Sequence, residues 1–486
     1  MAIHKENIKL TFGLKVKQLR LDQRLSLSEL AHKSGISISY LNEIEKGKKY
    51  PQTEKIMRLA EALQVSYDWL VSLKLHRKLA PLADVLKSNL LQDLPLEVFG
   101  VEPAQLLHLL SNAPTKLSAF ISTLIEISRN YDMSVEQFYF SVLRSYQELH
   151  DNYFEELEEE VQRFRQTFQA PEEITAVWLT QQLEETYQYT IRANSFVPAL
   201  ANLRSALIDK ELLINEHLNE IQKRFVLARE LGYQFMQLQE RAYTFSWVEI
   251  NSFEEVLNNF KASYFASALL MDKEAFKADL TTFLSFDTWQ PIFLNQLLVK
   301  YQVTPEMLLH RMTNLLPKFF QLPQLFFLRF SHQAGRFALT KEMHLAGLHN
   351  PHGSALGEHY CRRWVSLTLL QELEEAIEKQ HYEAPLVDAQ ISNYYDSANE
   401  YLVFSIARPM TPTPSLSNSV SIGILLTQEV KERIGFLESL PVRKVGETCE
   451  RCSATDCEVR MAHPVVLHKQ AEASARKEAL TALFKQ

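Results

Sequence analysis

Hydrophobic residues recur three and four positions apart through most of the first two thirds of the chain, which is the spacing of amphipathic helices. Residues 26–46 show the pattern most clearly. Ser26 and Glu29 have the spacing of a capping box, and Ser37 can cap a second helix. Gly35 lies between them, where a tight turn needs a residue with positive φ. The positions predicted to face a core are Leu27, Leu30, Ala31, Ile38, Leu41 and Ile44. The segment therefore predicts a helix, a turn and a second helix.

The opposite side of the second predicted helix is polar. A short polar helix supported by a preceding one is the geometry that enters the major groove of DNA. The residues predicted to face the groove are Ser37, Ser39, Tyr40, Asn42 and Glu43, and those predicted to lie near phosphates are Lys46, Lys48 and Lys49. Base contacts specify a sequence, whereas phosphate contacts position the protein and make binding depend on salt. The alternative is a small helical bundle that contacts another protein.

Residues 79–170 also have helical periodicity. The longest apolar stripe runs from Val135 to Phe168, and its period of about 3.67 residues suits a nearly straight helix. We expect this helix either to mediate dimerisation or to lie buried along its own domain. The acidic run at 155–160 is predicted to be a solvated face.

The pattern changes after residue 320, where short runs rich in β-branched and aromatic residues replace helical spacing. Strands are predicted at 325–330, 336–341, 401–408 and 420–426, and a helix at 364–379. The first two strands are close enough to form a hairpin. Strands around a few helices are typical of a module that senses a small molecule.

Charge is distributed unevenly along the 486 residues. Residues 1–80 hold 15 Lys and Arg against 8 Asp and Glu, whereas the rest holds 36 against 51. A basic head on an acidic body is the pattern expected of a phosphate-binding module attached to another structure. The charge therefore favours double-stranded DNA as a partner.

No run of about 18 apolar residues is present, so we expect no transmembrane helix. The first residues lack the apolar core of a signal peptide, which predicts a cytoplasmic protein. Four cysteines in so long a chain do not form a disulfide framework. In a reducing compartment, clustered cysteines more often bind metal or take part in redox chemistry.

Three of the four cysteines form a C-x2-C-x4-C motif near the end of the chain. Cys449, Cys452 and Cys457 are followed by His463, and Cys361 is the remaining thiol. We expect the four cysteines to converge on one metal centre. Thiolates suit a [4Fe–4S] cluster, which we favour, and also structural zinc with Cys361 or His463 as fourth ligand. The cysteines could instead be buried without a ligand.

Residues 8–74 as a whole resemble the Cro/cI-type helix-turn-helix family. The likeness covers the lead helix FGLKVKQLRLDQRLS, the two helices already described, the segment EKGKKYPQTEKIMRLAEAL and the closing QVSYDWLVSL. It implies a five-helix head that binds DNA.

Residues 224–235, RFVLARELGYQF, resemble the helix that carries the H-E-x-x-H zinc motif of ImmA/IrrE-type metallopeptidases. The likeness implies that Arg229 and Tyr233 stand at the two His positions and that Glu230 is retained. Residues 261–272 resemble the helix of the third ligand, where Lys261 replaces a Glu. Arg, Tyr and Lys do not bind Zn²⁺, so we expect no catalytic residues and no enzyme activity. The cations could hold an anion, but we favour ion pairs with carboxylates such as Glu230.

The order of these parts resembles the short-chain fatty acyl transcriptional regulators over nearly the whole chain. That likeness implies a regulator of carbon or fatty acid metabolism, an acyl-CoA effector and an iron–sulfur cluster. We expect a homodimer that binds DNA and responds to a small intracellular signal. An alternative is an ImmA/IrrE-type peptidase that cleaves a repressor.

The predicted fold is multidomain and mainly α, with an α+β sensor module. The predicted parts are a helix-turn-helix domain at 1–78, a helical linker or dimerisation region at 79–170, and a degenerate peptidase-like α domain at 171–320. An α+β sensor follows at 321–440, and a cysteine motif with a helical tail at 441–486.

Overall fold

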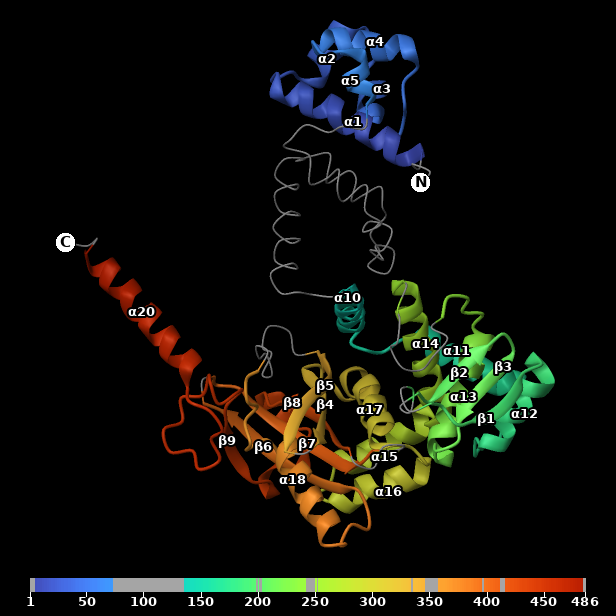
Figure 1. The fold of residues 1–486 in the computed structure, drawn as a ribbon, viewed down its shortest axis with the longest axis vertical. Coiled ribbons are helices and arrows are strands. Elements are labelled where there is room, and N and C mark those ends of the chain that lie inside the picture. Colours follow the sequence, from blue (N-terminus) through green and yellow to red (C-terminus); the bar gives the residue numbers. More distant parts are fainter. Residues whose placement is uncertain are drawn as a thin grey trace. The chain divides into compact units, whose positions relative to one another are not determined.

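The computed structural model describes residues 5–72, 135–197, 200, 203–241, 250, 252–333, 335–345, 357–395, 397–410 and 416–483. The chain divides into two compact units, Met1–Val142 with Asn251–Glu254 and Leu143–Ile250 with Glu255–Gln486. Figure 1 shows the head helices in blue and the elements of the second unit from green to red. The helices predicted between 79 and 134 lie outside the described residues.

The head consists of α1 (Lys5–Asp22), α2 (Leu27–Ser34), α3 (Ile38–Glu45), α4 (Thr53–Ala62) and α5 (Tyr67–Val71). Its buried core draws on all five helices and on the loops between them. The fully buried members include Val16, Leu30, Leu41, Leu59 and Leu70. This arrangement confirms the predicted five-helix head.

The long helix predicted from 135 to 168 is interrupted. The structure has α10 (Val135–Leu149) and α11 (Glu155–Thr167), and between them Asp151 and Asn152 have positive φ. The buried Asn152 side chain donates to Thr313 Oγ1 at 3.0 Å, and its carbonyl accepts from Asn314 at 2.8 Å. The prediction of one straight helix is therefore wrong, because tertiary hydrogen bonds stabilise a turn at this point.

The second helix of this pair packs into the middle of the chain. Phe164 on α11 meets Phe235 and Phe265 edge-on. The predicted solvated face at 155–160 is also only partly correct. Glu158 is buried and accepts two hydrogen bonds from the buried Arg311, at 2.5 and 3.0 Å.

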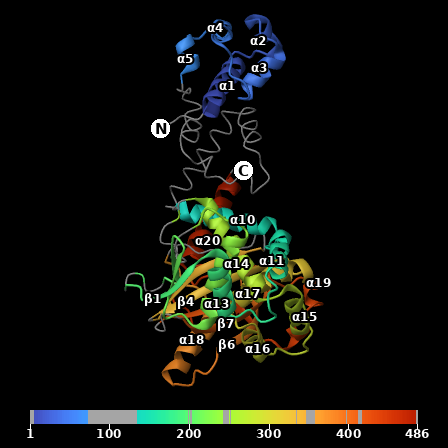
Figure 2. The ribbon, with the colours of Figure 1, turned by 90° about the vertical axis from the view of Figure 1, so that its right-hand side faces the viewer.

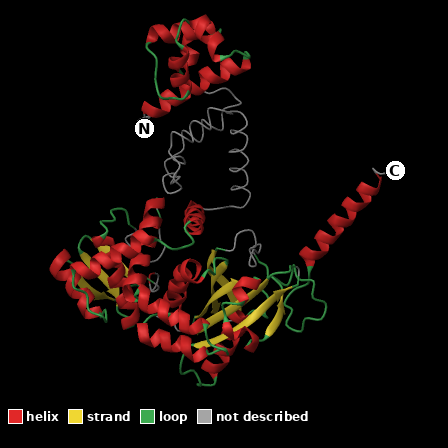
Figure 3. Ribbon diagram, turned by 180° about the vertical axis from the view of Figure 1, so that it is seen from behind, coloured by secondary structure: helices red, strands yellow, loops and turns green. Residues whose placement is uncertain are grey.

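The middle of the chain contains helices and a small sheet. The helices are α12 (Ala176–Tyr187), α13 (Glu220–Phe235), α14 (Phe253–Leu270), α15 (Lys273–Leu284), α16 (Pro291–Tyr301) and α17 (Pro305–Phe320). The strands β1 (Thr190–Asn194), β2 (Ser205–Ile208) and β3 (Glu211–Asn215) pair in the order β1-β3-β2. The α-only expectation for this domain is thus corrected, since strands of four or five residues give too short a pattern to be recognised. Figure 3 shows this sheet apart from the larger one.

The larger sheet follows α17. Its strands are β4 (Leu325–Gln333), β5 (Arg336–His344), β6 (Leu386–Tyr394), β7 (Glu400–Pro409), β8 (Ser417–Leu425) and β9 (Val442–Val445), in the order β5-β4-β8-β7-β6-β9. The predicted hairpin is confirmed as β4 and β5, and the other two predicted strands as β7 and β8. Strands β6 and β9 were not predicted.

Helices cover both faces of the larger sheet. Leu328 and Phe330 on β4 pack in one core cluster with α18 (Val365–Glu378). Phe327, on the opposite face, stacks on His310 of α17 with ring centroids 4.2 Å apart. The short helix α19 (Gln428–Lys431) and the 3-10 helix η4 (Gly435–Ser439) follow the sheet, and α20 (Val465–Leu483) projects from this module (Figure 1). The fold is multidomain and mainly helical with an α+β module, as predicted.

Candidate functional site

Local hydrogen bonds build the helix-turn-helix of the head as its sequence predicts. The Ser26 N–H donates to Glu29 at 2.7 Å, and the Glu29 N–H donates to Ser26 Oγ at 3.1 Å. Gly35 ends α2 with φ of 63°, and Ser37 accepts from the Tyr40 N–H at 3.3 Å. Because each end of the motif is fixed locally, α3 begins at a defined point.

The face of α3 predicted to contact DNA is open to solvent at its start. Ser37 and Ser39 are exposed, whereas Asn42 and Glu43 are half-buried. Tyr40 is not simply outward, because it packs against the core and lies under two cations. Its ring centroid is 4.2 Å from Lys55 Nζ and 5.8 Å from Lys49 Nζ.

One predicted core position of α3 is wrong. The Ile38 side chain is 50% exposed, whereas Ile36, just before the helix, is buried. Ile36 packs in the head core that Ile38 was expected to join, because the chain already enters that core before α3 begins. Ile38 therefore adds an apolar group to the exposed side of α3, where a thymine methyl is a suitable partner.

The lysines that follow α3 lie on a turn fixed to it. The Lys48 and Lys49 N–H groups donate to the Glu43 carbonyl at 3.0 and 3.2 Å. Both side chains are exposed, and Lys46 is half-buried. These positive groups thus lie next to the polar helix, in the arrangement that phosphate contacts require.

Two buried cations in the head were not predicted. Arg20 on α1 donates to both oxygens of the buried Glu45 of α3, at 2.6 and 2.9 Å. Lys15 Nζ donates to the Trp69 and Ser72 carbonyls at 2.7 and 2.5 Å, and burial lowers its pKa to about 8. Glu45 follows Leu41 by one helical turn, so its place on the inward stripe was the available signal.

The retained glutamate of the peptidase-like segment is fully engaged. Glu230 on α13 is buried and accepts from both Arg241 Nη atoms at 2.6 Å and from the Tyr189 hydroxyl at 2.6 Å. Burial raises the pKa of Glu230, but hydrogen bonds and charge from Arg241 outweigh it and leave the pKa below its usual value. A carboxylate with these partners is held ionised and fixed. Helix α13 can be followed in Figures 1 and 2.

The structure places Arg229 and Tyr233 beside α14. Arg229 is buried, donates to Asn259 Oδ1 at 3.2 Å, and has its pKa lowered to about 10 by burial. The Tyr233 hydroxyl reaches the same oxygen at 3.5 Å, and its ring centroid lies 4.2 Å from the Arg241 guanidinium. Arg241, which was not predicted, donates to both oxygens of Glu230, and the predicted cation Arg229 attracts the same carboxylate electrostatically. Lys261 is half-buried.

The sheet module brings Cys361 next to the cysteine motif. Tyr360 and Thr448 form an antiparallel bridge, and the Cys361 N–H donates to the Glu447 carbonyl at 3.2 Å. The Gly446 N–H donates to Cys361 Sγ at 3.4 Å. A Cβ on Gly446 would lie 2.8 Å from Cys452 Sγ, so only glycine permits this approach.

Charges and hydrogen bonds link all four thiols to this one region. The Met461 N–H donates to Cys449 Sγ at 3.3 Å. Burial raises the pKa of Cys361, with smaller effects from Cys452 and Cys449. Arg363 interacts electrostatically with Cys457, which is half-buried.

Arg460 donates to the carbonyls of Cys449, Cys452 and Ala454 and so holds the loop in place. His463 is exposed.

The side chains are not arranged as a closed metal site. Within the described residues, no group of three or more His, Cys, Asp or Glu side chains is placed to hold a metal ion. The four cysteines are free thiols.

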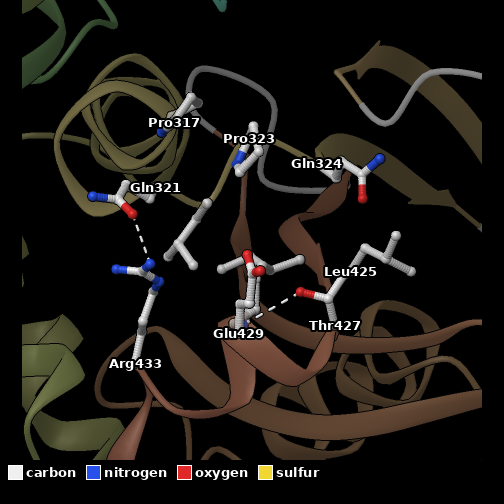
Figure 4. Close-up of a pocket in the computed structure, with 11 residues that line it drawn as sticks. Pro317, Gln321, Pro323, Gln324, Leu425, Thr427, Glu429 and Arg433 are labelled. Atoms are coloured by element: carbon white, nitrogen blue, oxygen red, sulfur yellow. Dashed lines mark hydrogen bonds between the residues drawn. The ribbon is translucent and has the colours of Figure 1, made fainter.

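A cavity of about 420 Å³ lies where the end of α17 meets the edges of β4, β8 and α19 (Figure 4). Pro323 and Leu425 line it, and Glu429 and Arg433 are polar groups at its walls. Arg433 donates to Gln321 Oε1 at 2.6 Å. Both charged residues are exposed, so the cavity is a shallow surface site.

Two stretches of the chain match known families. Residues 16–70 match the helix-turn-helix model, and residues 184–313 match the IrrE N-terminal-like domain model. The chain therefore contains a helix-turn-helix domain of the Cro/cI type and an IrrE-like domain.

Two individual proteins are also similar. The HTH-type transcriptional repressor RghR of Bacillus subtilis is 37% identical over 62 residues, which are 13% of this chain and 46% of that protein. The match thus spans less than half of that relative. A Mycobacterium tuberculosis transcriptional regulator of known structure is 16% identical with a TM-score of 0.47, covering 67% of this chain and 93% of that one.

Among the helices that the structure describes, none combines the length and the apolar character that a membrane span requires.

Proposed function

We propose that the chain is a sequence-specific DNA-binding transcriptional regulator that responds to a small intracellular signal. The observation that carries the proposal is the polar face of α3, supported by α2 and followed by lysines on a basic head. This is the geometry by which a recognition helix reads base edges while neighbouring cations contact phosphates. The similarity of the head to a transcriptional repressor supports the same function.

Each surface residue of α3 has a distinct role in this proposal. The amide of Asn42 pairs with adenine, and Ser37 and Ser39 contact base edges or phosphates. The Tyr40 ring is held by Lys49 and Lys55 and so presents a fixed edge to the groove. Selection of bound sequences from a random DNA library by the full chain tests the proposal. We expect one enriched motif, and recovery of unrelated sequences would contradict it.

A homodimer is the expected form of the regulator. Each head of the dimer would bind one half-site of the DNA. Because only one arrangement of the two heads matches the half-site spacing, a signal that changes this arrangement can change the affinity for DNA. The signal would shift the population between arrangements. The proposed signal is an acyl-CoA, the redox or iron state of the cell, or both. The regulated genes would belong to carbon or fatty acid metabolism.

The cysteine cluster is the proposed redox-responsive element. Its donor set consists of soft thiols, which fit a [4Fe–4S] cluster and also structural zinc. The N–H groups of Gly446 and Met461 point at two of the sulfur atoms, and Arg362 and Arg363 add positive charge nearby. When bound, an iron–sulfur cluster would supply one-electron redox chemistry. To hold it, Cys361, Cys449, Cys452 and Cys457 would have to come closer together than they lie among the described residues, where they form no group placed to bind a metal ion.

The iron–sulfur and zinc alternatives predict different colours and metal contents for the purified protein. Anaerobically purified full chain with broad visible absorbance, iron and sulfide would support the iron–sulfur proposal. A colourless sample with one zinc per chain would show instead that the motif is a structural zinc site. Replacement of Cys361 by Ser should reduce the metal content if that thiol is the remote fourth ligand, and unchanged metal content would show that His463 or water completes the site instead.

The IrrE-like domain is proposed to be a scaffold without peptidase activity. Metal-dependent hydrolysis needs metal ligands and a free carboxylate that activates water. Arg229 and Tyr233 occupy the positions of the two histidines, and Glu230 already accepts hydrogen bonds from Arg241 and Tyr189. The domain would therefore join the head to the sensor module.

A further inference from the structure

Two segments that carry thiols are paired beside the start of α18. Residues 358–361 lead into that helix, and residues 446–452 hold the first part of the cysteine motif. Tyr360 and Thr448 form an antiparallel bridge between them. Because antiparallel pairing holds facing Cα atoms about 5 Å apart, the two segments lie side by side.

Charged side chains fix the same two segments. Arg451 donates to both oxygens of Glu358, each at 2.8 Å. The Glu450 carboxylate accepts from the His359 N–H at 2.9 Å and lies 2.7 Å from His359 Nδ1. Both carboxylates are largely shielded from solvent, with side-chain exposures of 8% for Glu358 and 10% for Glu450. Cys452 follows Arg451 directly, so its backbone is held against the first segment.

The sulfur atoms of Cys361 and Cys452 lie against the same glycine. The Gly446 N–H donates to Cys361 Sγ at 3.4 Å, and a Cβ on Gly446 would lie 2.8 Å from Cys452 Sγ. Trp364 Nε1 donates to the Gly446 carbonyl at 3.0 Å and keeps this glycine in place. Among the thiols that act on Cys361 electrostatically, Cys452 has the largest effect. These two thiols are therefore neighbours.

The other two thiols have different surroundings. Cys449 Sγ accepts from the Met461 N–H at 3.3 Å. Cys457 is half-buried, whereas Cys361 and Cys452 are both buried. Since no three ligand side chains converge on one point within the described residues, the structure singles out one pair of thiols rather than a set of four.

We propose that Cys361 and Cys452 form a reversible disulfide when the chain holds no metal. A disulfide needs its two Cα atoms about 4–7 Å apart. Pairing of the two segments, with both sulfur atoms against Gly446, favours that approach. The inference rests on the proposed function, since that function includes the redox state among its signals, but it assigns the response to the thiols themselves.

A peroxide is the oxidant in this step. One of the two sulfur atoms attacks a peroxide oxygen, which breaks the O–O bond, releases one water molecule and leaves a sulfenic acid. The second sulfur atom then attacks the first, which forms the S–S bond and releases the oxygen as another water molecule. The protons of both thiols leave in the water. Two thiols are thus oxidised and one peroxide is reduced.

Peptide mapping of the full chain tests the proposal. The chain is reduced, freed of metal with a chelator, treated with equimolar hydrogen peroxide, alkylated and digested with trypsin. Cleavage after lysine and arginine places Cys361 in peptide 342–362, Cys449 in 445–451, and the other two cysteines in 452–460. We expect a link between 342–362 and 452–460 that dithiothreitol removes. The same treatment in urea should give mixed links, because the fold no longer directs the pairing.

Two variants identify which thiol of peptide 452–460 takes part. Cys457→Ser should keep the link to Cys361, and Cys452→Ser should lose it. Because Cys457→Ser leaves both proposed partners in place, the test does not depend on how well Cys452→Ser folds. Absence of a link in the parent chain, a link to peptide 445–451 instead, or loss of the link in Cys457→Ser would overturn the proposal.

Failure of this proposal is distinguishable from failure of the proposed function. The DNA selection is carried out on the reduced chain, so one enriched motif without the link refutes the disulfide alone. The link in a chain that selects unrelated sequences supports the disulfide and refutes the proposed function.

Discussion

The head and the IrrE-like domain each hold a buried glutamate with a bidentate arginine, yet the two pairs have opposite consequences. In the head, Arg20 of α1 pairs with Glu45 on the buried side of α3, and Ser37 and Ser39 at the start of that helix stay exposed. In the IrrE-like domain, Arg241 binds Glu230 itself, the residue that such enzymes use to activate water. In the proposed function, the same interaction supports the recognition helix in one region and occupies the carboxylate in the other.

The difference shows that retention of a fold and retention of its chemistry are separate matters. The IrrE-like domain matches its family model over 184–313, and we propose that Arg229 and Tyr233 stand at two ligand positions of that family. Its core includes apolar positions on α13 and α14, for example Leu231 and Phe265, which are fully buried. In the head, the residues that set the fold and those that would contact DNA both remain.

Removal of Arg241 is expected to have the largest effect. Arg241→Ala leaves the buried Glu230 without its guanidinium, which should lower the free energy of unfolding of the second unit by about 3–5 kcal/mol. Urea denaturation followed by tryptophan fluorescence measures the loss. The matched control is Arg476→Ala on α20, whose exposed pair with Glu472 should contribute less than about 1 kcal/mol. Equal losses in the two variants would contradict the account of Glu230 as a sealed carboxylate.

Asn42→Ala tests the open face of α3. Loss of the side-chain amide should reduce discrimination between the selected DNA sequence and a scrambled one by about 1–3 kcal/mol. The melting temperature should change little, because Asn42 is not part of the hydrophobic core of the head. Competition binding at fixed salt is the measurement. Full discrimination by the variant would show that Asn42 does not read bases.

Ser26→Ala tests how much the local cap contributes to the head. The change removes the hydroxyl that accepts from the Glu29 N–H, and should lower helix stability by about 1 kcal/mol. Thermal melting followed by circular dichroism reports the effect, and Ser26→Asp should recover most of it. A variant as stable as the parent would mean that packing alone fixes the start of α2.

Lys48→Ala should have the smallest effect, and one that is independent of sequence. Loss of one phosphate contact should reduce the slope of log K against log salt by about 0.9. Titration at several salt concentrations with specific and scrambled DNA measures the slope. A loss confined to the specific sequence would assign Lys48 to base contacts instead.

Local chemistry explains which parts of this structure the sequence predicts. Ser26, Glu29, Gly35 and Ser37 act through neighbours within three residues, so their spacing is sufficient. Ile36 lies in the core of the head where Ile38 was predicted. This depends on how α3 packs against the other helices, which the spacing of apolar residues in the sequence does not determine. The turn at Asn152 depends on Thr313 and Asn314, more than 150 residues away.

The candidate sites differ in the same way. The C-x2-C-x4-C spacing identifies three thiols, and the approach of Cys361 follows from the bridge between Tyr360 and Thr448. The pairing of Arg241 with Glu230 was missed because no helical or strand spacing relates the two residues.

The affinity of the full chain for its selected DNA sequence, compared with a scrambled sequence at the same salt concentration, tests the central claim most directly. Specific binding by a helix-turn-helix protein is typically tighter than its non-specific binding by a factor of about 10³ or more. We predict a ratio of that size, with the same salt dependence for both sequences except where phosphate contacts differ. Equal affinity for the two sequences would contradict the assignment of α3 as a recognition helix.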